Sequence, residues 1–304
     1  MADASIRFSG GRVPLRIWLV AARPRTLPAA IAPVLVGTAL AGSEGTFHAL
    51  RFMAALGGSI FIQIGTNLSN DYSDAHRGAD TEERLGPVRV TSAGLVAPRQ
   101  VLMATWLAFA VAVAFGAYLI AVVGWELLLV GAASILAGVL YTGGPRPYGY
   151  EGLGELFVFF FFGLVAVAGS YYVQAEQVTW EAFVLAVPVG LLASAILVVN
   201  NVRDLESDRR AGKRTLAVRL GRERARTLYG LMVYGAFLTA PVPWVAGSLS
   251  AWLLLPLVLL PVAVSLVRVV RGHADGPTLN LALARTGMLQ LAFCVLLSAG
   301  LLLS

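Results

Sequence analysis

The sequence predicts an all-α membrane protein built as a bundle of nine transmembrane helices. Three observations carry this prediction: the composition, the length of the apolar runs and the distribution of positive charge. Hydrophobic residues make up 58% of the 304 residues and charged residues only 13%. Soluble domains carry about 25% charged residues. A chain of this composition, with a mean hydropathy of +0.76, is expected to lie in a lipid bilayer.

Apolar runs long enough to cross a bilayer, about 20 residues each, recur along the chain. Turn-forming stretches such as GSEGT, GGPRPYGYEG and RGHADGP separate them. We expect a single integral-membrane domain over 1–304, in which residues 1–20 form a cytoplasmic N-terminal arm. Arginines interrupt the apolar patch of this first segment, so it is not a signal peptide. The predicted spans are 27–42, 50–69, 101–123, 127–141, 156–173, 183–200, 228–246, 252–270 and 279–303.

Positive charge sets the predicted orientation of the bundle. With the N-terminus inside, all of the 23 lysine and arginine residues except Arg51 belong to inner segments. Cytoplasmic loops are enriched in Lys and Arg, so the N-terminus is predicted to be cytoplasmic. The same rule accounts for the net charge of +6, and we expect no nucleic-acid partner. The predicted location is the inner (plasma) membrane of the cell, crossed several times.

Metal sites built from cysteine or histidine are not expected. The one cysteine, Cys294, lies in an apolar run, and the three histidines are scattered. A disulfide framework or a cysteine-based metal site is therefore excluded.

Two of the predicted spans end in acidic stretches. The second span continues into NLSNDYSDAHRGAD at 67–80, and the sixth continues into NNVRDLESD at 200–208. Four crossings separate the two stretches, so both open on the cytoplasmic side. On a helix each stretch would form a stripe of oxygen acceptors on one face, because its members are spaced by three or four residues. The two stripes are Asn67, Asn70, Asp71 and Asp74, and Asn201, Asp204 and Asp208.

Carboxylates grouped at membrane depth are costly unless a cation offsets their charge. Oxygen ligands without Cys or His select Mg²⁺ or Ca²⁺. Mg²⁺ typically takes one or two carboxylates and completes its shell with water and substrate phosphates. A single cluster of this kind is more often a solvated helix end, but two stripes on one side indicate two half-sites for a diphosphate. The predicted catalytic residues and metal ligands are Asp71, Asp74, Asp204 and Asp208.

The same stretches resemble a known family. NDYSD at 70–74 and DLESD at 204–208 are similar to the two Asp-rich motifs of the UbiA superfamily of intramembrane prenyltransferases, which have nine transmembrane helices. Four longer stretches resemble one branch, the 1,4-dihydroxy-2-naphthoate prenyltransferases of menaquinone synthesis: ARPRTLPAAIAPVLVG at 22–37, NLSNDYSDAHRGADTEERLGPVRVTSAG at 67–94, YTGGPRPYGYEGLGELFVFFFFG at 141–163 and NNVRDLESDRRAGKRTLAVRLG at 200–221. The resemblance covers about 20–225, and the last three helices are similar only in hydrophobicity.

The resemblance implies a UbiA-type bundle whose active site opens to the cytoplasmic side. A polyprenyl diphosphate would bind Mg²⁺ between the two motifs, with its tail among the helices. The prenyl group would pass to 1,4-dihydroxy-2-naphthoate with loss of CO₂, which gives demethylmenaquinone. The residues expected to bind the substrates are Arg25, Asn67, Asn70, Arg77, Asp80, Tyr141, Arg146, Tyr148, Asn201, Lys213 and Arg214.

Several alternatives stay open from the sequence. The acceptor is either the naphthoate or another aromatic acid such as 4-hydroxybenzoate. Arg23 is as good a partner for the acceptor carboxylate as Arg25, and Asp80 is nearly as well explained as a loop charge. Four aromatic residues either stabilise a carbocation or contribute only to packing: Tyr72, Tyr141, Tyr148 and Phe157. A transporter is the alternative from another class, but its charges would lie at the membrane midplane.

Overall fold

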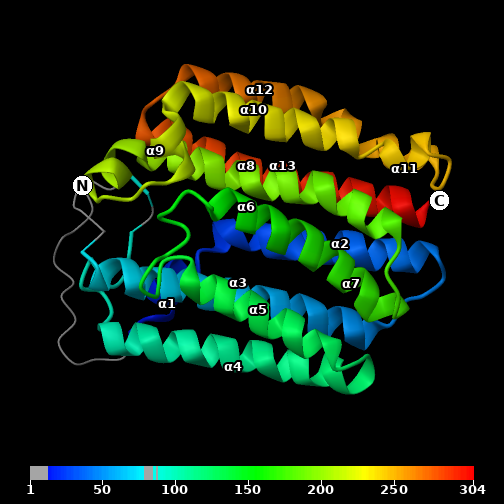
Figure 1. The fold of residues 1–304 in the computed structure, drawn as a ribbon, viewed down its shortest axis with the longest axis horizontal. Coiled ribbons are helices and arrows are strands. Elements are labelled where there is room, and N and C mark those ends of the chain that lie inside the picture. The colour runs from blue at the N-terminus through cyan, green and yellow to red at the C-terminus, as the bar shows by residue number, and fades with distance from the viewer. Residues whose placement is uncertain (1–12, 79–84, 87) are drawn as a thin grey trace.

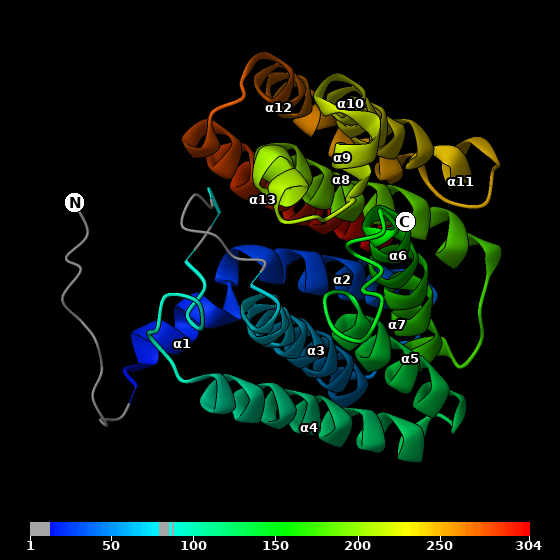
Figure 2. The same ribbon diagram turned by 60° about the vertical axis from the view of Figure 1, so that its left-hand side comes forward.

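The computed structural model describes residues 13–78, 85–86 and 88–304, and all regular secondary structure in these segments is helical. Figures 1 and 2 show the long helices stacked in layers, from α4 at one edge through α3, α2 and α8 to α10 and α12 at the other. The elements are α1 (Leu15–Ala22), η1 (Pro24–Thr26), α2 (Leu27–Ser43), α3 (Ala49–His76), α4 (Pro98–Val122), α5 (Glu126–Leu140), α6 (Gly154–Val158), η2 (Phe159–Val165), α7 (Ala166–Ala175), α8 (Trp180–Arg210), α9 (Leu216–Leu220), α10 (Arg222–Thr239), α11 (Val242–Val245), η3 (Ala251–Leu259), α12 (Leu260–Gly272) and α13 (Gly276–Leu302).

Eight helical segments in the described part of the chain are long and apolar enough to cross a membrane. They correspond to eight of the nine predicted spans. The remaining one, predicted at 127–141, is α5, whose 15 residues reach about 22 Å, less than the roughly 30 Å of a bilayer core. The all-helical membrane fold predicted from the sequence is confirmed, with eight candidate spans and one shorter apolar helix.

The two helices that carry the acidic stripes extend further than predicted. Helix α3 continues to His76 and α8 to Arg210, whereas the predicted spans ended at 69 and 200. Each helix ends just before a glycine with positive φ, Gly78 (φ 63°) and Gly212 (φ 73°). Glycine adopts this left-handed conformation without a steric penalty and commonly terminates helices. Both acidic stripes therefore lie in regular helix and not in loops.

Other predicted helices are irregular. The fifth span begins as α6, passes through the π-helical turn η2 and continues as α7. The eighth begins as the 3₁₀ segment η3, which contains Pro256, and becomes α-helical at Leu260. Before α2, Arg23 takes a left-handed conformation (φ 54°) and is followed by Pro24, so the helix α1, which begins within the predicted arm, is set at an angle to α2.

Helix α8 is the most buried of the eight candidate spans and forms the centre of the core. It packs against α10, α13 and η2, and its Leu185, Val189 and Leu192 are fully buried. The contact with η2 is between backbones: a Cβ added to Gly163 would lie 2.7 Å from Cα of Gly190. Small residues permit such close approach of helices in membranes.

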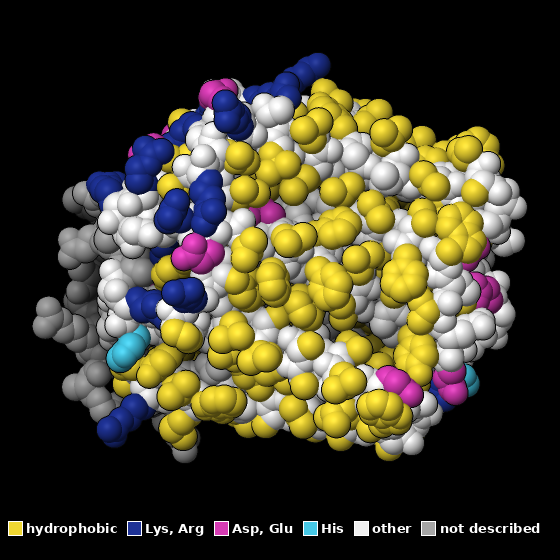
Figure 3. All heavy atoms as spheres, viewed as in Figure 1, with side chains coloured by type: hydrophobic (Ala, Val, Ile, Leu, Met, Phe, Trp, Pro, Cys, Tyr) yellow, Lys and Arg dark blue, Asp and Glu magenta, His cyan; other side chains and the backbone are white. Residues whose placement is uncertain are grey.

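Charge is segregated along the molecule. Figure 3 shows Lys and Arg side chains gathered at one end, around α9 and the start of α10, and a broad hydrophobic band over the middle. The C-terminal ends of α3 and α8 lie at the same basic end, where the side chains of Lys213 and Asp74 approach to 3.5 Å. A basic end beside a broad hydrophobic band is the distribution expected of a multi-pass membrane protein.

The Gly163–Gly190 contact gives a first prediction. Gly163→Ala should lower the free energy of unfolding by about 1–3 kcal/mol, because its Cβ would overlap backbone atoms that cannot move independently. Thermal unfolding in detergent measures this loss. Gly131→Ala is the matched control, since a Cβ there meets nothing within 4 Å. Equal stability of the two variants would contradict the prediction.

Candidate active site

A cavity of about 820 Å³ runs between α2, α3, α5, η2 and α8. Its volume lies within the range of small-molecule sites. Its charged lining residues include those in the last turns of α3 and α8, whereas the lining residues from α4, α5 and η2 are mostly apolar. The cavity therefore combines a charged end with an apolar body.

Asp74, in the last turn of α3, is the centre of the charged end and is 1% exposed. Its carboxylate accepts hydrogen bonds from Arg89 Nη2, at 2.5 Å, and from the Tyr150 hydroxyl. Lys213 Nζ lies 3.5 Å from the same carboxylate and 4.6 Å from the centre of the Tyr150 ring. Two cations around one carboxylate leave a local excess of positive charge, which suits an anionic ligand.

Asp71 is also 1% exposed, but it has a different environment. Its Oδ2 accepts from the backbone N–H of Val90 at 2.9 Å, and its Oδ1 accepts from that of Thr91 at 3.0 Å. It does not line the cavity. In this structure Asp71 fixes the segment that presents Arg89 to Asp74.

The end of α8 supplies the facing wall of the cavity. Arg203 and Asp204 form a buried pair, in which Nη2 donates to Oδ2 at 2.5 Å and Nε to Oδ1 at 2.8 Å. Arg203 also donates to Asn280 on α13 at 2.7 Å. Asp208, one turn further along α8, is half-buried and lines the same cavity. Acidic residues from both predicted stripes thus reach one site.

The predicted asparagines are all buried and bonded to protein groups. Asn67 donates to the carbonyl of Ala22, and Asn70 accepts from the Thr142 hydroxyl at 2.8 Å. Asn201 donates to Glu155 Oε1 at 2.9 Å. These amides line the cavity and join α3 and α8 to neighbouring segments.

The predicted basic residues divide into two groups. Lys213 and Arg25 line the cavity. Arg77 donates to the carbonyl of Gly144, and it is exposed, as are Arg146 and Arg214; none of the three lines the cavity. The predicted residue Asp80 lies outside the described residues.

Aromatic side chains line the region next to the charged end. Tyr148 stacks on Phe157 with ring centroids 4.0 Å apart and meets Tyr141 edge-on at 5.4 Å. The Tyr148 hydroxyl donates to the carbonyl of Ala137 at 2.8 Å. Burial raises the pKa of Tyr148, so its phenol keeps its proton.

Sequence reasoning missed several charged or polar residues of the site, among them Arg89, Tyr150 and Arg203, which all line the cavity. Each of these three belongs to a stretch on which the family resemblance rests, GPVR, RPYGYEG and NNVRD. Those stretches were a signal, but a single sequence does not show which of their residues turn inward.

The donors present suit a hard cation. Amide and carboxylate oxygens of Asn70, Asp74, Asn201, Asp204 and Asp208 line the charged end. Within 13–78, 85–86 and 88–304, no three His, Cys, Asp or Glu residues converge on one point that would hold a metal. Mg²⁺ fits such a site, because it needs only one or two protein carboxylates when a phosphate ligand completes its shell.

Comparison with known proteins agrees with this geometry. The profile of the UbiA prenyltransferase family matches residues 30–289. The chain belongs to the UbiA prenyltransferase family. Among solved structures, a UbiA homologue from Archaeoglobus fulgidus bound to GPP and Mg²⁺ superposes with a TM-score of 0.67 at 15% identity, over 94% of this chain and 99% of that chain. This likeness confirms the UbiA-type fold.

Curated family members are more similar in sequence. The 1,4-dihydroxy-2-naphthoate octaprenyltransferase of Mycobacterium leprae is 41% identical over 94% of this chain and 96% of its own length. The enzyme of the same name from Escherichia coli is 38% identical over 88% of this chain and 89% of its own. The resemblance to this branch of the UbiA family, predicted from the motifs, is confirmed.

The role of Asp71 gives a second prediction. Asp71→Ala leaves the N–H groups of buried Val90 and half-buried Thr91 without their acceptor, so we expect a loss of about 1–3 kcal/mol in unfolding free energy. Hydrogen exchange at Val90 and Thr91 should accelerate in the same variant. Glu206→Ala, an exposed carboxylate on α8, serves as the control. Unchanged protection of Val90 and Thr91 in Asp71→Ala would contradict the role of Asp71 in holding this segment.

Proposed function

We propose that this protein transfers a polyprenyl group from polyprenyl diphosphate to 1,4-dihydroxy-2-naphthoate, in a Mg²⁺-dependent reaction that releases diphosphate and CO₂ and gives demethylmenaquinol, the reduced form of demethylmenaquinone. The cavity is the observation that carries the proposal. Its charged end suits a diphosphate, and its apolar body suits an isoprenoid chain. Identities of 38–41% to enzymes named for this acceptor support the choice of substrate.

Arg89 and Lys213 would hold the diphosphate, because both are buried at the charged end and carry the local excess of positive charge. Negative charge grows on the diphosphate as the allylic C–O bond breaks. Fixed cationic donors stabilise that charge more in the transition state than in the ground state. Mg²⁺, held by Asp74 and by Asp204 or Asp208, would supply Lewis-acid neutralisation of the same group.

The apolar body of the cavity would hold the prenyl chain and exclude water, which would otherwise trap an allylic cation. The faces of Tyr148, Phe157 and Phe161 would stabilise positive charge on the chain. Attack by the electron-rich ring at the carbon that bears the carboxylate forms the new C–C bond. The electrons of the C–CO₂ bond then restore the aromatic ring as CO₂ leaves.

We propose that the charged end opens to the cytoplasm, with the N-terminal arm on the same side, in the inner (plasma) membrane. The arginines gathered at this end support the orientation by the positive-inside rule. The diphosphate head group and the water-soluble acceptor acid would then reach the site from the cytoplasmic side.

The acceptor is tested directly. Purified protein with polyprenyl diphosphate and Mg²⁺ should convert 1,4-dihydroxy-2-naphthoate to a product whose mass shows the prenyl group added and CO₂ lost. It should leave 4-hydroxybenzoate unchanged. EDTA should abolish turnover and excess Mg²⁺ should restore it. Conversion of 4-hydroxybenzoate instead would replace the proposed acceptor, and transport of a labelled substrate into proteoliposomes without chemical change would replace the proposed class.

The second stripe is tested by substitution. Of Asp204→Asn and Asp208→Asn, at least one should lower turnover by about a hundredfold or more, since it removes the metal ligand that α8 supplies. Glu206→Gln, on the same helix but exposed, should leave turnover unchanged. Thermal unfolding confirms that the variants fold. Wild-type turnover in both aspartate variants would remove α8 from the metal site.

A further inference from the structure

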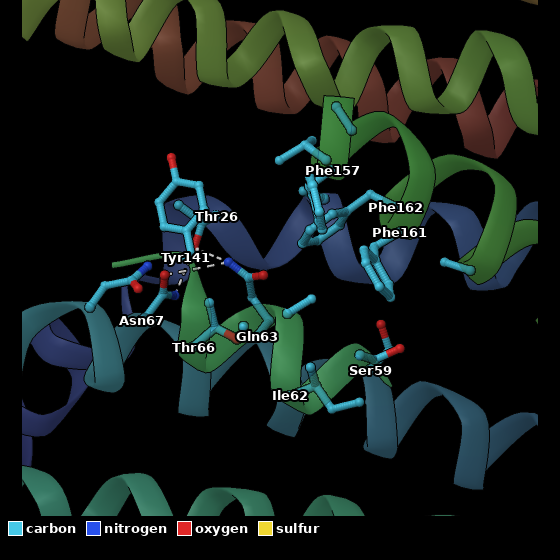
Figure 4. A pocket seen from close by; sticks show the side chains of 18 of the residues that line it. Thr26, Ser59, Ile62, Gln63, Thr66, Asn67, Tyr141, Phe157, Phe161 and Phe162 are labelled. Carbon is cyan, nitrogen blue, oxygen red and sulfur yellow. Dashed lines mark hydrogen bonds between the residues drawn. The ribbon is translucent and has the colours of Figure 1, made fainter. Parts of the chain in front are cut away.

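A second polar cluster lies on the cavity wall, apart from the Asp74 centre. It consists of Thr26 at the end of η1 and of Gln63 and Asn67 on α3, all of which line the cavity. Gln63 Nε2 donates to Thr26 Oγ1 at 3.2 Å and to Asn67 Oδ1 at 3.4 Å. Asn67 Nδ2 donates to Thr26 Oγ1 at 3.0 Å. Figure 4 shows the three side chains joined by these bonds.

The bonds fix which way the Gln63 amide faces. The Thr26 hydroxyl donates its proton to the carbonyl of Arg23 at 3.0 Å, so its oxygen accepts from both amides. Asn67 Nδ2 also donates to the carbonyl of Ala22 at 3.0 Å, so Asn67 Oδ1 is the atom turned to Gln63. A flipped Gln63 would place its oxygen against two oxygens with no proton between them. Nε2 therefore faces the cluster.

The other end of the amide has no partner within the protein. Gln63 is 8% exposed, and its Oε1 is buried without a hydrogen bond. Figure 4 shows this oxygen on the side of the amide away from Thr26 and Asn67, toward the side of the cavity where Phe161 and Phe162 lie. A buried carbonyl without a donor is unfavourable, so the site is built to receive one.

Of the substrates proposed above, only one carries such a donor. The polyprenyl chain has only C–H bonds, and an ionised diphosphate only accepts hydrogen bonds. A dihydroxylated ring has two O–H donors. We propose that Gln63 Oε1 accepts a hydrogen bond from a ring hydroxyl of the aromatic acceptor, so that Gln63 orients the ring and selects hydroxylated acceptors. This inference rests on the proposed function.

The position suits selection. Gln63 stands one turn before Asn67 and two turns before Asn70 on the face of α3 that leads to Asp74, so a ring held there lies beside the diphosphate end. A site built to bond a hydroxyl rejects an analogue that lacks it, because the buried carbonyl then stays unpaired. A neutral amide oxygen also binds the hydroxyl without removing its proton.

The test measures binding without turnover. Quenching of naphthoate fluorescence, in reducing detergent solution without Mg²⁺ or diphosphate, gives the Kd of 1,4-dihydroxy-2-naphthoate for the wild type and for Gln63→Met. The variant should bind about tenfold more weakly. Of 1-hydroxy-2-naphthoate and 4-hydroxy-2-naphthoate, one should bind the wild type about tenfold more weakly than the dihydroxy acid. Gln63→Met should not distinguish that analogue from the dihydroxy acid.

Gln290→Met is the matched control. Gln290 is fully buried on α13, has an unpartnered Oε1 and does not line the cavity. Gln290→Met should therefore bind the dihydroxy acid and the monohydroxy analogues as the wild type does. The KM for polyprenyl diphosphate should be unchanged in Gln63→Met. If that variant fails to fold, Gln63→Asn, which withdraws the carbonyl by one methylene, should show the same loss.

Two results overturn the inference and are distinguishable. If the wild type binds the dihydroxy acid and Gln63→Met binds it equally well, the role of Gln63 is wrong while the proposed function stands. If the wild type binds none of the three naphthoates and does not prenylate the dihydroxy acid, the proposed function fails together with the inference.

Discussion

The site depends on the interactions of one buried carboxylate, that of Asp74. It joins four segments far apart in sequence: the end of α3, the segment that carries Arg89, the loop that carries Tyr150 and the turn after α8 that carries Lys213. A charge this deeply buried is stable only while its partners stay in place, and removal of one partner of a buried pair commonly costs about 3–5 kcal/mol. The same network that neutralises Asp74 therefore assembles the charged end of the cavity.

A second pair works in the same way on the opposite wall. Arg203 holds Asp204 through two bonds and reaches Asn280 on α13, so the orientation of the carboxylate is set by a residue next to it in sequence. Asp71 performs a related task with backbone groups, since its two oxygens hold the segment that follows Arg89. Acidic residues in this protein thus differ in role: some line the cavity, and at least one shapes its wall.

The division of the cavity into a charged end and an apolar body follows from the direction of the helices. Helices α3 and α8 both carry their Asn and Asp residues in their last turns, and both stop just before a left-handed glycine at the basic end of the molecule. Their earlier turns are mostly apolar, as expected at membrane depth. The proposed amphiphilic substrate would place its diphosphate and its chain along one axis, and the Gln63 cluster adds a neutral polar group to the cavity wall.

The sequence by itself determined the membrane class, the approximate spans, the UbiA relationship and the helix ends that carry acidic residues, because hydrophobicity, charge asymmetry and motif spacing are local properties. Tertiary structure alone decided that Asp71 faces a backbone segment while Asp74 faces the cavity, although they are only three positions apart on one helix. It also decided that Arg89, Tyr150, Arg203 and Gln63 reach the site. Those assignments depend on contacts between segments distant in sequence, and no local pattern records them.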